Sequence, residues 1–311
     1  MVNVNRIRAI KNCNTMKIYR YLALAAISML LFASCVHSGD LDLDPIPDIG
    51  FTYSSDGLTL TFTSSTEGTT GITWATSDGG TGSGESLSHK FPSPDTYWIE
   101  MKGTLNGKEQ SVSTKVIVAK PAIVSVTDNS LSDWDKVKYE DFIFTGSENG
   151  VLPIVEGKAD YDANWLYLYL AFDTKLAEEK AATGYICDLS IDGDDDIATG
   201  FEVNGIGGEY LVEGCFFGKA WYDFYHGTTG ADWWDDGTLA DPKYSAGLVL
   251  GHEEQDGNVI KVELAFKRDT FGITGTKCAI QMTLFNDDWS DLDYLMFGGV
   301  SDIHLSLDKT E

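Results

Sequence analysis

The sequence predicts an all-β fold of two β-sandwich domains. Short segments in which apolar and polar residues alternate recur along the chain, for example at residues 58–62, 97–101 and 260–266, between clusters of Gly, Asp, Asn and Ser. Residues 165–172 are apolar at every position, which predicts a central strand covered on both faces. Only residues 175–182 show a helical pattern.

A break at Ala119-Lys120-Pro121, where a strand pattern ends and a proline opens the next segment, predicts the domain boundary. This boundary gives a small immunoglobulin-like sandwich over residues 48–120 and a larger sandwich over residues 121–311. Residues 44–47, Asp-Pro-Ile-Pro, are predicted to be a stiff linker before the first domain.

The N-terminal residues have the parts of a secretory signal peptide. Lys17 and Arg20 are followed by an apolar run over residues 21–32, by the small pair Ala33-Ser34 and by Cys35. We expect residues 1–34 to be this signal, with residues 1–15 as an upstream extension. A transmembrane anchor is the alternative, but the run is shorter than the ~20 residues that a spanning helix needs.

The Phe-Ala-Ser-Cys ending resembles the lipoprotein signals of Bacteroidetes, which implies that Cys35 is the lipidation site. Residues 35–47 would then be an acidic tether, and the acidic run Gly39–Asp44 resembles the signal for export to the outer face of the outer membrane. A solvated acidic tether is the plain alternative for this run. The resemblance implies a lipid-anchored, cell-surface protein of the outer membrane.

The charge balance excludes two classes of partner. The chain has 22 basic and 48 acidic residues and a net charge of −26. Without residues 1–34 it keeps 17 basic and 48 acidic residues, a net charge of −31. Such a surface repels nucleic acid and anionic lipid, so membrane contact is expected only through the lipid anchor. Strongly anionic polysaccharides are also disfavoured unless calcium bridges them.

Three cysteines remain after Cys35, namely Cys187, Cys215 and Cys278, and each lies in an apolar segment that resembles a strand. No CxxC spacing indicates zinc. We expect buried free thiols, and one disulfide with one free thiol is the alternative.

Residues 72–118 resemble a PKD-type domain, a small immunoglobulin-like sandwich. The matching residues are Trp74, Asp78-Gly79, His89, Tyr97 and Ile99. Thr76-Ser77, Phe91 and Asp95 depart from the family pattern. The resemblance implies a spacer between anchor and second domain. A binding role for Trp98, predicted to point outward, is the alternative.

The second domain resembles the family 9 carbohydrate-binding modules and their DOMON-like relatives. The resemblance rests on the Leu-x-Asp-Trp entry at residues 131–134 and on four strand or loop motifs, at residues 160–168, 191–200, 209–214 and 263–266. It implies the sandwich fold, and it leaves the ligand open because relatives bind sugars, haem or nothing known.

The loop Asp192–Asp196 carries four carboxylates in five positions, which repel one another unless a cation lies among them. Calcium prefers such oxygen ligands, so we predict a structural Ca²⁺ held by Asp192, Asp194 and Asp196. A solvated acidic turn is the alternative.

Aromatic residues gather in polar loops of the same domain. Flat rings stack on the faces of sugars, and carboxylates bond to hydroxyl groups, so these loops predict a sugar platform. Packing inside the sandwich is the alternative, and we expect it for at least one of the tryptophans at 233 and 234. The candidate ligand-binding residues are Trp221, Trp233, Trp234, Trp289, Tyr225, Asp232 and Asp235.

We therefore predict a non-catalytic surface lipoprotein that captures polysaccharide or oligosaccharide for an outer-membrane uptake system, with a porin-type transporter as a further partner. No catalytic motif such as GxSxG occurs. The alternative is a calcium-stiffened adhesion or assembly protein. Haem binding would need axial ligands such as His226 or Met282, and Met282 is predicted to face the core.

Overall fold

The computed structural model describes residues 47–230 and 232–310. The predicted signal peptide, the lipidation site Cys35 and nearly all of the acidic tether lie outside these residues. Within the described part, no helix has the length and hydropathy to cross a membrane.

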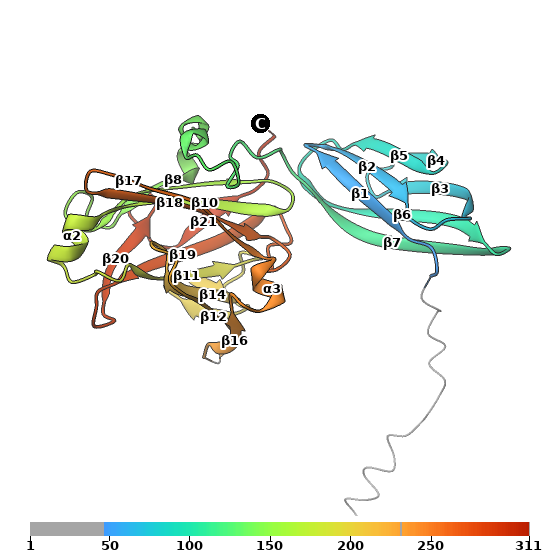
Figure 1. The fold of residues 1–311 in the computed structure, drawn as a ribbon. Helices are drawn as coiled ribbons and strands as arrows, with labels where there is room; N and C mark the ends of the chain where they lie inside the picture. The colour runs from blue at the N-terminus through green and yellow to red at the C-terminus, as the bar shows by residue number, and fades with distance from the viewer. Residues whose placement is uncertain (1–46, 231, 311) are drawn as a thin grey trace, which may run out of the picture. The chain divides into compact units, whose positions relative to one another are not determined.

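The first seven strands form two antiparallel sheets, ordered β1-β2-β5 and β4-β3-β6-β7 (Figure 1). Their inner faces enclose a core that includes Phe62, Trp74 and Ile99. The strands are β1 (Phe51–Asp56), β2 (Thr59–Ser64), β3 (Thr70–Thr76), β4 (Thr81–Ser83), β5 (Ser86–Lys90), β6 (Asp95–Leu105) and β7 (Lys108–Val118). This is a small β-sandwich.

Strand β6 shows how the alternation in the sequence sorts its side chains. Tyr97 and Ile99 are buried, whereas Trp98 between them is 52% exposed, with the Lys115 ammonium 5.3 Å from its ring centroid. The predicted outward direction of Trp98 is therefore correct, because neighbouring residues of a strand face opposite sides.

The remaining strands form one long antiparallel sheet that curls into a second sandwich. Its order is β16-β15-β14-β11-β19-β20-β8-β9-β10-β18-β17, β21 pairs with β19, and β12-β13 is a separate hairpin. The strands are β8 (Ile143–Gly146), β9 (Ile154–Tyr161), β10 (Trp165–Asp173), β11 (Ile186–Asp192), β12 (Phe201–Val203), β13 (Ile206–Gly208), β14 (Tyr210–Cys215), β15 (Tyr222–His226), β16 (Trp234–Thr238), β17 (Leu248–Asp256), β18 (Val259–Lys267), β19 (Lys277–Phe285), β20 (Asp291–Met296) and β21 (Ile303–Ser306).

Among the described residues, helices are few and short. They are the 3₁₀ turns η1 (Ser132–Lys136) and η2 (Glu140–Phe142) and the α-helices α2 (Thr174–Glu179) and α3 (Pro242–Ser245). Helix α2 begins one residue before the segment that the sequence marks as helical and ends within it, and Asp173 caps it by accepting from the N–H groups of Lys175 and Leu176. The prediction of an all-β fold of two sandwiches is thus confirmed.

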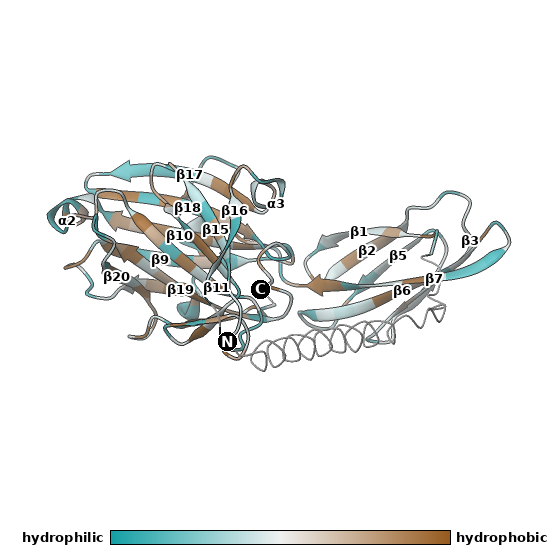
Figure 2. Ribbon diagram, turned by 90° about the horizontal axis from the view of Figure 1, so that it is seen from below, coloured by the Kyte–Doolittle hydropathy of each residue, from teal (hydrophilic) through white to brown (hydrophobic). Residues whose placement is uncertain are grey.

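Strand β10 is buried on both faces, as predicted. Leu168, Leu170 and Phe172 point into the main core between the two layers. Tyr167 and Tyr169 point to the other side, where they pack against Val124, Val126, Trp134 and Val137 from the segment that precedes β8. Figure 2 shows hydrophobic residues along β9, β10 and β18. The segment over residues 121–140 therefore covers the outer face of this layer.

A buried ion pair attaches this covering segment to the sheet. The ammonium of Lys120 bonds to the Asp160 carboxylate, and both side chains are fully buried. The second carboxylate oxygen of Asp160 accepts the Ile123 N–H at 2.6 Å, and Lys120 also donates to the Tyr161 carbonyl at 3.1 Å. Every charged atom in the pair thus has hydrogen-bonding partners.

Cys187, Cys215 and Cys278 are buried free thiols, as predicted, and the alternative of one disulfide is wrong. Burial raises the pKa of the Cys278 thiol to about 12. A thiol that is buried and fully protonated behaves as a small apolar side chain, so these cysteines serve the core.

Lys120→Met should lower the free energy of unfolding by about 3–5 kcal/mol, because it leaves the buried Asp160 carboxylate without its counter-charge. Lys136→Met, which removes the exposed partner of Asp133, should cost at most about 1 kcal/mol. Urea denaturation of both variants measures the difference. Equal losses would contradict a structural role for the buried pair.

Candidate functional site

The outer face of the layer opposite the covered one carries a row of acidic side chains. Strand register places Asp188 beside Thr283 on one side and beside Glu213 on the other, and Glu213 beside Asp223. Their sequence neighbours Leu189, Val212 and Phe224 are buried in the core, so the acidic residues face outward. We call Asp188, Glu213 and Asp223 the acidic row.

Asp188 is the most unusual member of this row. Its Oδ1 atom is buried and has no hydrogen-bond partner among the described residues. Burial, reinforced by the charges of Glu213 and Asp291, raises the pKa of Asp188 to about 7. Native structures rarely leave a buried acceptor unpaired, and such an atom calls for an explanation.

Glu213 and Tyr225 extend this polar surface. The Tyr225 hydroxyl donates to the Glu213 carboxylate at 3.4 Å. Burial raises the pKa of both groups, that of Tyr225 to about 12, with further contributions from the charges of Glu213 and Asp223. The hydroxyl therefore stays protonated at neutral pH and remains a hydrogen-bond donor.

Two tryptophans meet at one end of the acidic row. The ring centroids of Trp221 and Trp289 lie 6.4 Å apart with an interplanar angle of 42°, and Phe285 lies 6.0 Å from Trp289. The Cys215 N–H donates to the Trp221 carbonyl at 3.2 Å, so the ladder continues one residue before β15. Trp221, Asp223 and Tyr225 consequently share the outer face.

Trp289 is held outward by a tight loop. Its φ angle is +68°, a left-handed conformation that is unfavourable for a bulky residue, and its side chain is 50% exposed. The Trp289 N–H donates to the Asn286 carbonyl at 3.0 Å, and the Asn286 N–H donates to the Ser290 carbonyl at 3.1 Å. Strained residues that the surrounding structure fixes in this way are concentrated at functional sites.

The structure does not bring all four predicted tryptophans to one surface. Trp233 is partly buried, and its ring packs 5.3 Å from that of Phe201. A Cβ atom built on Gly208 would lie 2.8 Å from the Trp233 ring, so this ring closely covers the strand that leads into β14. Trp233 therefore has the packing role that was expected for at least one of the pair.

Trp234 and the two predicted aspartates lie near β16. Trp234 is 61% exposed. In the pairing of β15 with β16, Asp235 lies opposite Tyr225 and Trp234 lies opposite His226. Because neighbouring residues of a strand face opposite sides, Trp234 points away from the face that carries Tyr225 and Asp235. Asp232 is exposed, and its carboxylate accepts the Trp233 N–H at 2.8 Å. Of the predicted ligand-binding residues, Trp221, Trp289, Tyr225 and Asp235 thus share a face.

A candidate metal centre lies where β11 leads into the acidic loop. Carboxylate oxygens of Asp192, Asp194 and Glu209 all lie within 4.8 Å of one another. Glu209 accepts the Gly193 N–H at 2.8 Å and the Thr199 hydroxyl at 2.6 Å, which fixes it against the loop. Burial raises the pKa of both Asp192 and Glu209. Hard oxygen ligands in this arrangement suit calcium.

Asp196, predicted as the third ligand, is not in this group. Its carboxylate accepts the Ala198 N–H at 3.0 Å, and its own N–H donates to Asp192 and Asp194 at 3.2 Å each. Asp196 therefore orients the other carboxylates through its backbone, and Glu209 takes the third place. Glu209 is 17 positions after Asp192, and only the pairing of β11 with β14 reveals that the two are close.

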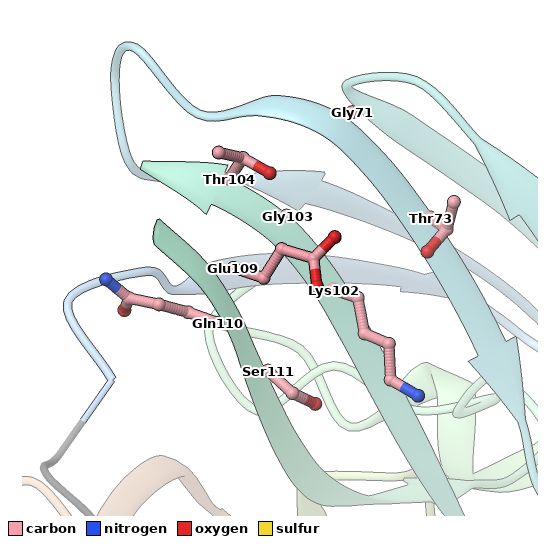
Figure 3. A pocket seen from close by; sticks show the side chains of 8 residues that line it. All are labelled: Gly71, Thr73, Lys102, Gly103, Thr104, Glu109, Gln110 and Ser111. Carbon is pink, nitrogen blue, oxygen red and sulfur yellow. The ribbon is translucent and has the colours of Figure 1, made fainter. Parts of the chain in front are cut away.

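A different pocket, on the small sandwich, lacks the features of this face. It has a volume of about 550 Å³ on the outer side of β3, β6 and β7, and polar side chains such as Thr73, Lys102 and Glu109 line it (Figure 3). None of its lining residues is aromatic. The combination of aromatic rings with buried carboxylates thus distinguishes the Trp221–Trp289 face.

Sequence reasoning missed Asp188, Glu213 and Phe285. Each stands next to a core residue in its strand, at a position where a charged or aromatic outward side chain can belong to a binding face. Alternation alone gives the face of each residue, whereas the strand order that joins β14, β11 and β19 was needed to bring the three together.

No protein-family model and no curated protein matches the sequence. Among solved structures, a family 9 carbohydrate-binding module from Caldicellulosiruptor kristjanssonii in complex with cellotriose matches 57% of this chain and 81% of its own. The identity is 14% and the TM-score 0.32. A likeness at this level identifies neither a family nor a ligand.

Asp188→Asn should stabilise the protein in a pH-dependent manner. Because the pKa of Asp188 is raised in the folded state, the wild type loses stability as the pH rises from about 4 to 7, and the amide lacks this loss. The variant should therefore be more stable by up to about 4 kcal/mol above pH 7 and no more stable near pH 4.

Denaturation at pH 4, 6 and 8 measures this difference. The exposed Glu202→Gln substitution is the control and should show no such trend. A constant difference between Asp188→Asn and the wild type across this range would contradict the buried, unpaired state of the carboxyl group.

Proposed function

We propose that this chain is a non-catalytic glycan-binding protein whose binding surface is the Trp221–Trp289 face. The observation that carries the proposal is Trp289, a half-exposed indole held in a strained conformation beside a second tryptophan. A packing role would not need the ring to be exposed. A stacking role needs it, because the ring face must contact the CH face of a sugar.

The acidic row supplies the polar half of this recognition. Asp188, Glu213 and Asp223 offer carboxylate oxygens that accept bonds from sugar hydroxyls, and Tyr225 offers a hydroxyl. A hydroxyl that reaches Oδ1 of Asp188 would give this buried atom the partner that it lacks. Because the row is negative, it favours neutral glycans over anionic ones.

The cellular setting of the proposal rests on the sequence. The signal-like N-terminus with Cys35 supports a lipid-anchored protein on the cell surface that captures polysaccharide or oligosaccharide for uptake through a porin-type transporter. The small sandwich would be a PKD-type spacer between the anchor and the binding domain.

Calcium is proposed as a structural ion at Asp192, Asp194 and Glu209. The three carboxylates are close, with Asp192 buried, Glu209 half-buried and Asp194 exposed, and a cation would relieve their mutual repulsion. The loop that they hold leads to the hairpin β12-β13, and Phe201 of this hairpin packs on Trp233. The ion would thus order the end of the sandwich that lies beyond the acidic row.

Trp289→Gly should weaken glycan binding strongly without unfolding the protein. Glycine accepts a φ of +68° freely, so relief of strain worth about 1–2 kcal/mol offsets the lost ring contacts. Affinity for a retained glycan, identified on a glycan array, should fall about 10- to 100-fold in Trp289→Gly and in Trp221→Ala. Calorimetry measures binding, and urea denaturation measures stability.

Trp98→Ala is the matched control, since it removes a tryptophan of similar exposure from the small sandwich. It should retain wild-type affinity. Unchanged affinity in both Trp221 and Trp289 variants would overturn the proposed site, and retention of an outer-membrane protein but no glycan would favour the adhesion alternative.

Calcium at saturating concentration should raise the melting temperature by roughly 5 °C or more relative to a chelator at pH 7.5. Because burial raises the pKa of Asp192 and Glu209, protons compete with calcium for these carboxylates at mildly acidic pH. The calcium-dependent increase in melting temperature should therefore shrink as the pH falls towards 5. Differential scanning calorimetry measures both effects.

Glu209→Gln should remove this calcium response, whereas Asp196→Asn, whose side chain lies outside the group, should retain it. An equal response in the wild type and in Glu209→Gln would show that calcium binds elsewhere.

A further inference from the structure

A second pocket lies on the layer that the N-terminal covering segment packs against. It has a volume of about 490 Å³, within the range of small-ligand sites. The turn at residues 129–135 forms one wall, strand β17 forms another, and strands β9, β10 and β18, neighbours in Figure 2, provide the floor. We call it the lysine pocket after Lys158 and Lys261, two of its lining residues.

A fully buried carboxylate builds two walls of the lysine pocket. One oxygen of Glu263 accepts the Trp134 indole N–H at 2.8 Å, and the other accepts the His252 N–H at 3.0 Å. A buried carboxylate is costly unless it is fully hydrogen-bonded, and here both oxygens are. Glu263 therefore fixes the turn at Trp134 and strand β17 at a constant separation.

Strand β17 carries an irregularity at this point. Its register with β18 shifts between Leu250 and Glu253. A Cβ atom on Gly251 would lie 2.5 Å from Cγ of Glu263, so only glycine allows the strand to approach this closely. Bulges of this kind re-aim side chains and are common next to binding sites. Here the bulge directs the wall residues His252 and Glu254 to the pocket.

Two ion pairs line the floor and the far wall. Lys158 lies 3.4 Å from Glu156, and Lys261 lies 3.3 Å from Glu254. The side chains of Lys158 and Lys261 are only 13% and 26% exposed, so the surrounding residues restrict their conformations. Each pair presents ammonium donors next to carboxylate acceptors, because an ammonium has three N–H groups and a carboxylate about four acceptor sites.

Tyr169 adds a hydroxyl to the floor. Its ring is buried against Trp134, with the centroids 5.7 Å apart, and the Lys158 ammonium lies 5.7 Å from its centroid. Burial, together with the charges of Glu156, Glu254 and Asp135, raises the pKa of this hydroxyl, so it stays protonated and can donate.

We propose that the lysine pocket is a second carbohydrate site, which takes one or two residues of a neutral glycan. Adjacent hydroxyls of a pyranose are each donor and acceptor, and they can bond to the nitrogen and the oxygen of one Lys–Glu pair together. The carboxylates disfavour an anion, the ammonium groups disfavour a cation, and the polar lining disfavours an apolar ligand.

This site lies on the opposite layer of the sandwich from the Trp221–Trp289 face and does not need that face to bind sugar. Two sites on one chain would raise retention on a polysaccharide through effective concentration, without a tighter contact at either. The second site thus extends the proposed function from simple capture to bivalent attachment.

Fluorine NMR of the full chain labelled with 5-fluorotryptophan tests both sites in one experiment. Trp134 reports on the lysine pocket, Trp221 and Trp289 report on the other face, and Trp74 in the core of the small sandwich is the internal reference. The probes are cellotriose, xylotriose, mannotriose and maltotriose, and single Trp→Phe variants assign the resonances. At least one sugar should shift the Trp134 resonance in a saturable manner.

Lys158→Met and Lys261→Met keep the aliphatic stems and remove the donors. Each should weaken the sugar-dependent shift of Trp134 at least tenfold and leave the shifts of Trp221 and Trp289 unchanged. Lys175→Met, on exposed helix α2, is the matched control and should alter neither. An unchanged Trp134 resonance before sugar is added shows that each variant is folded.

The outcomes separate the two proposals. If no sugar shifts Trp134, or if the shift persists in both methionine variants, the second site is overturned. If Trp134 responds and the other two do not, the second site is supported and the Trp221–Trp289 face is overturned. If only Trp221 and Trp289 respond, the proposed function is supported with one site.

Discussion

The buried pair of Lys120 and Asp160 decides which surfaces of the larger sandwich are open. It is fully shielded from water, and Asp160 also accepts backbone N–H groups of the segment that follows Lys120. The start of that segment therefore cannot leave β9 without exposing an unpaired charge to the apolar interior. From this point residues 121–140 run over β10, where Val124 and Trp134 cover Tyr167 and Tyr169.

The two layers of the sandwich consequently differ. Their inner faces are alike, since Leu168 and Leu170 from one layer meet Leu189 and Val212 from the other. The outer face of one layer is apolar because residues 121–140 cover it, and the lysine pocket opens at the edge of this covering segment. The outer face of the other layer is not covered and carries the acidic row and the aromatic rings beside it. The extent of the covering segment, residues 121–140, therefore determines where both candidate sites lie.

Much of this arrangement could be predicted from the sequence, because period-2 alternation reports directly on burial. The two-sided burial of β10, the outward Trp98 and the buried cysteines were all predicted correctly. Alternation carries no information on strand order, and the candidate sites depend on it. Glu209 joins Asp192 through strand pairing, and Trp289 meets Trp221 because two loops 68 positions apart end at the same edge. A run of neighbouring tryptophans was a poorer guide, since Trp233 and Trp234 face different surroundings.

Two carboxylates within the sandwich show how a fully bonded buried charge differs from one with an unpaired oxygen. Glu263 is fully buried, and both of its oxygens are bonded by groups that the chain itself supplies. Asp188 lies on an outer face opposite another carboxylate, with one buried oxygen unpaired. Burial raises the pKa of both, so a titration alone would not tell them apart. Their hydrogen bonds do, because a satisfied acceptor gains nothing from a sugar hydroxyl, whereas an unsatisfied one recovers much of its lost hydration.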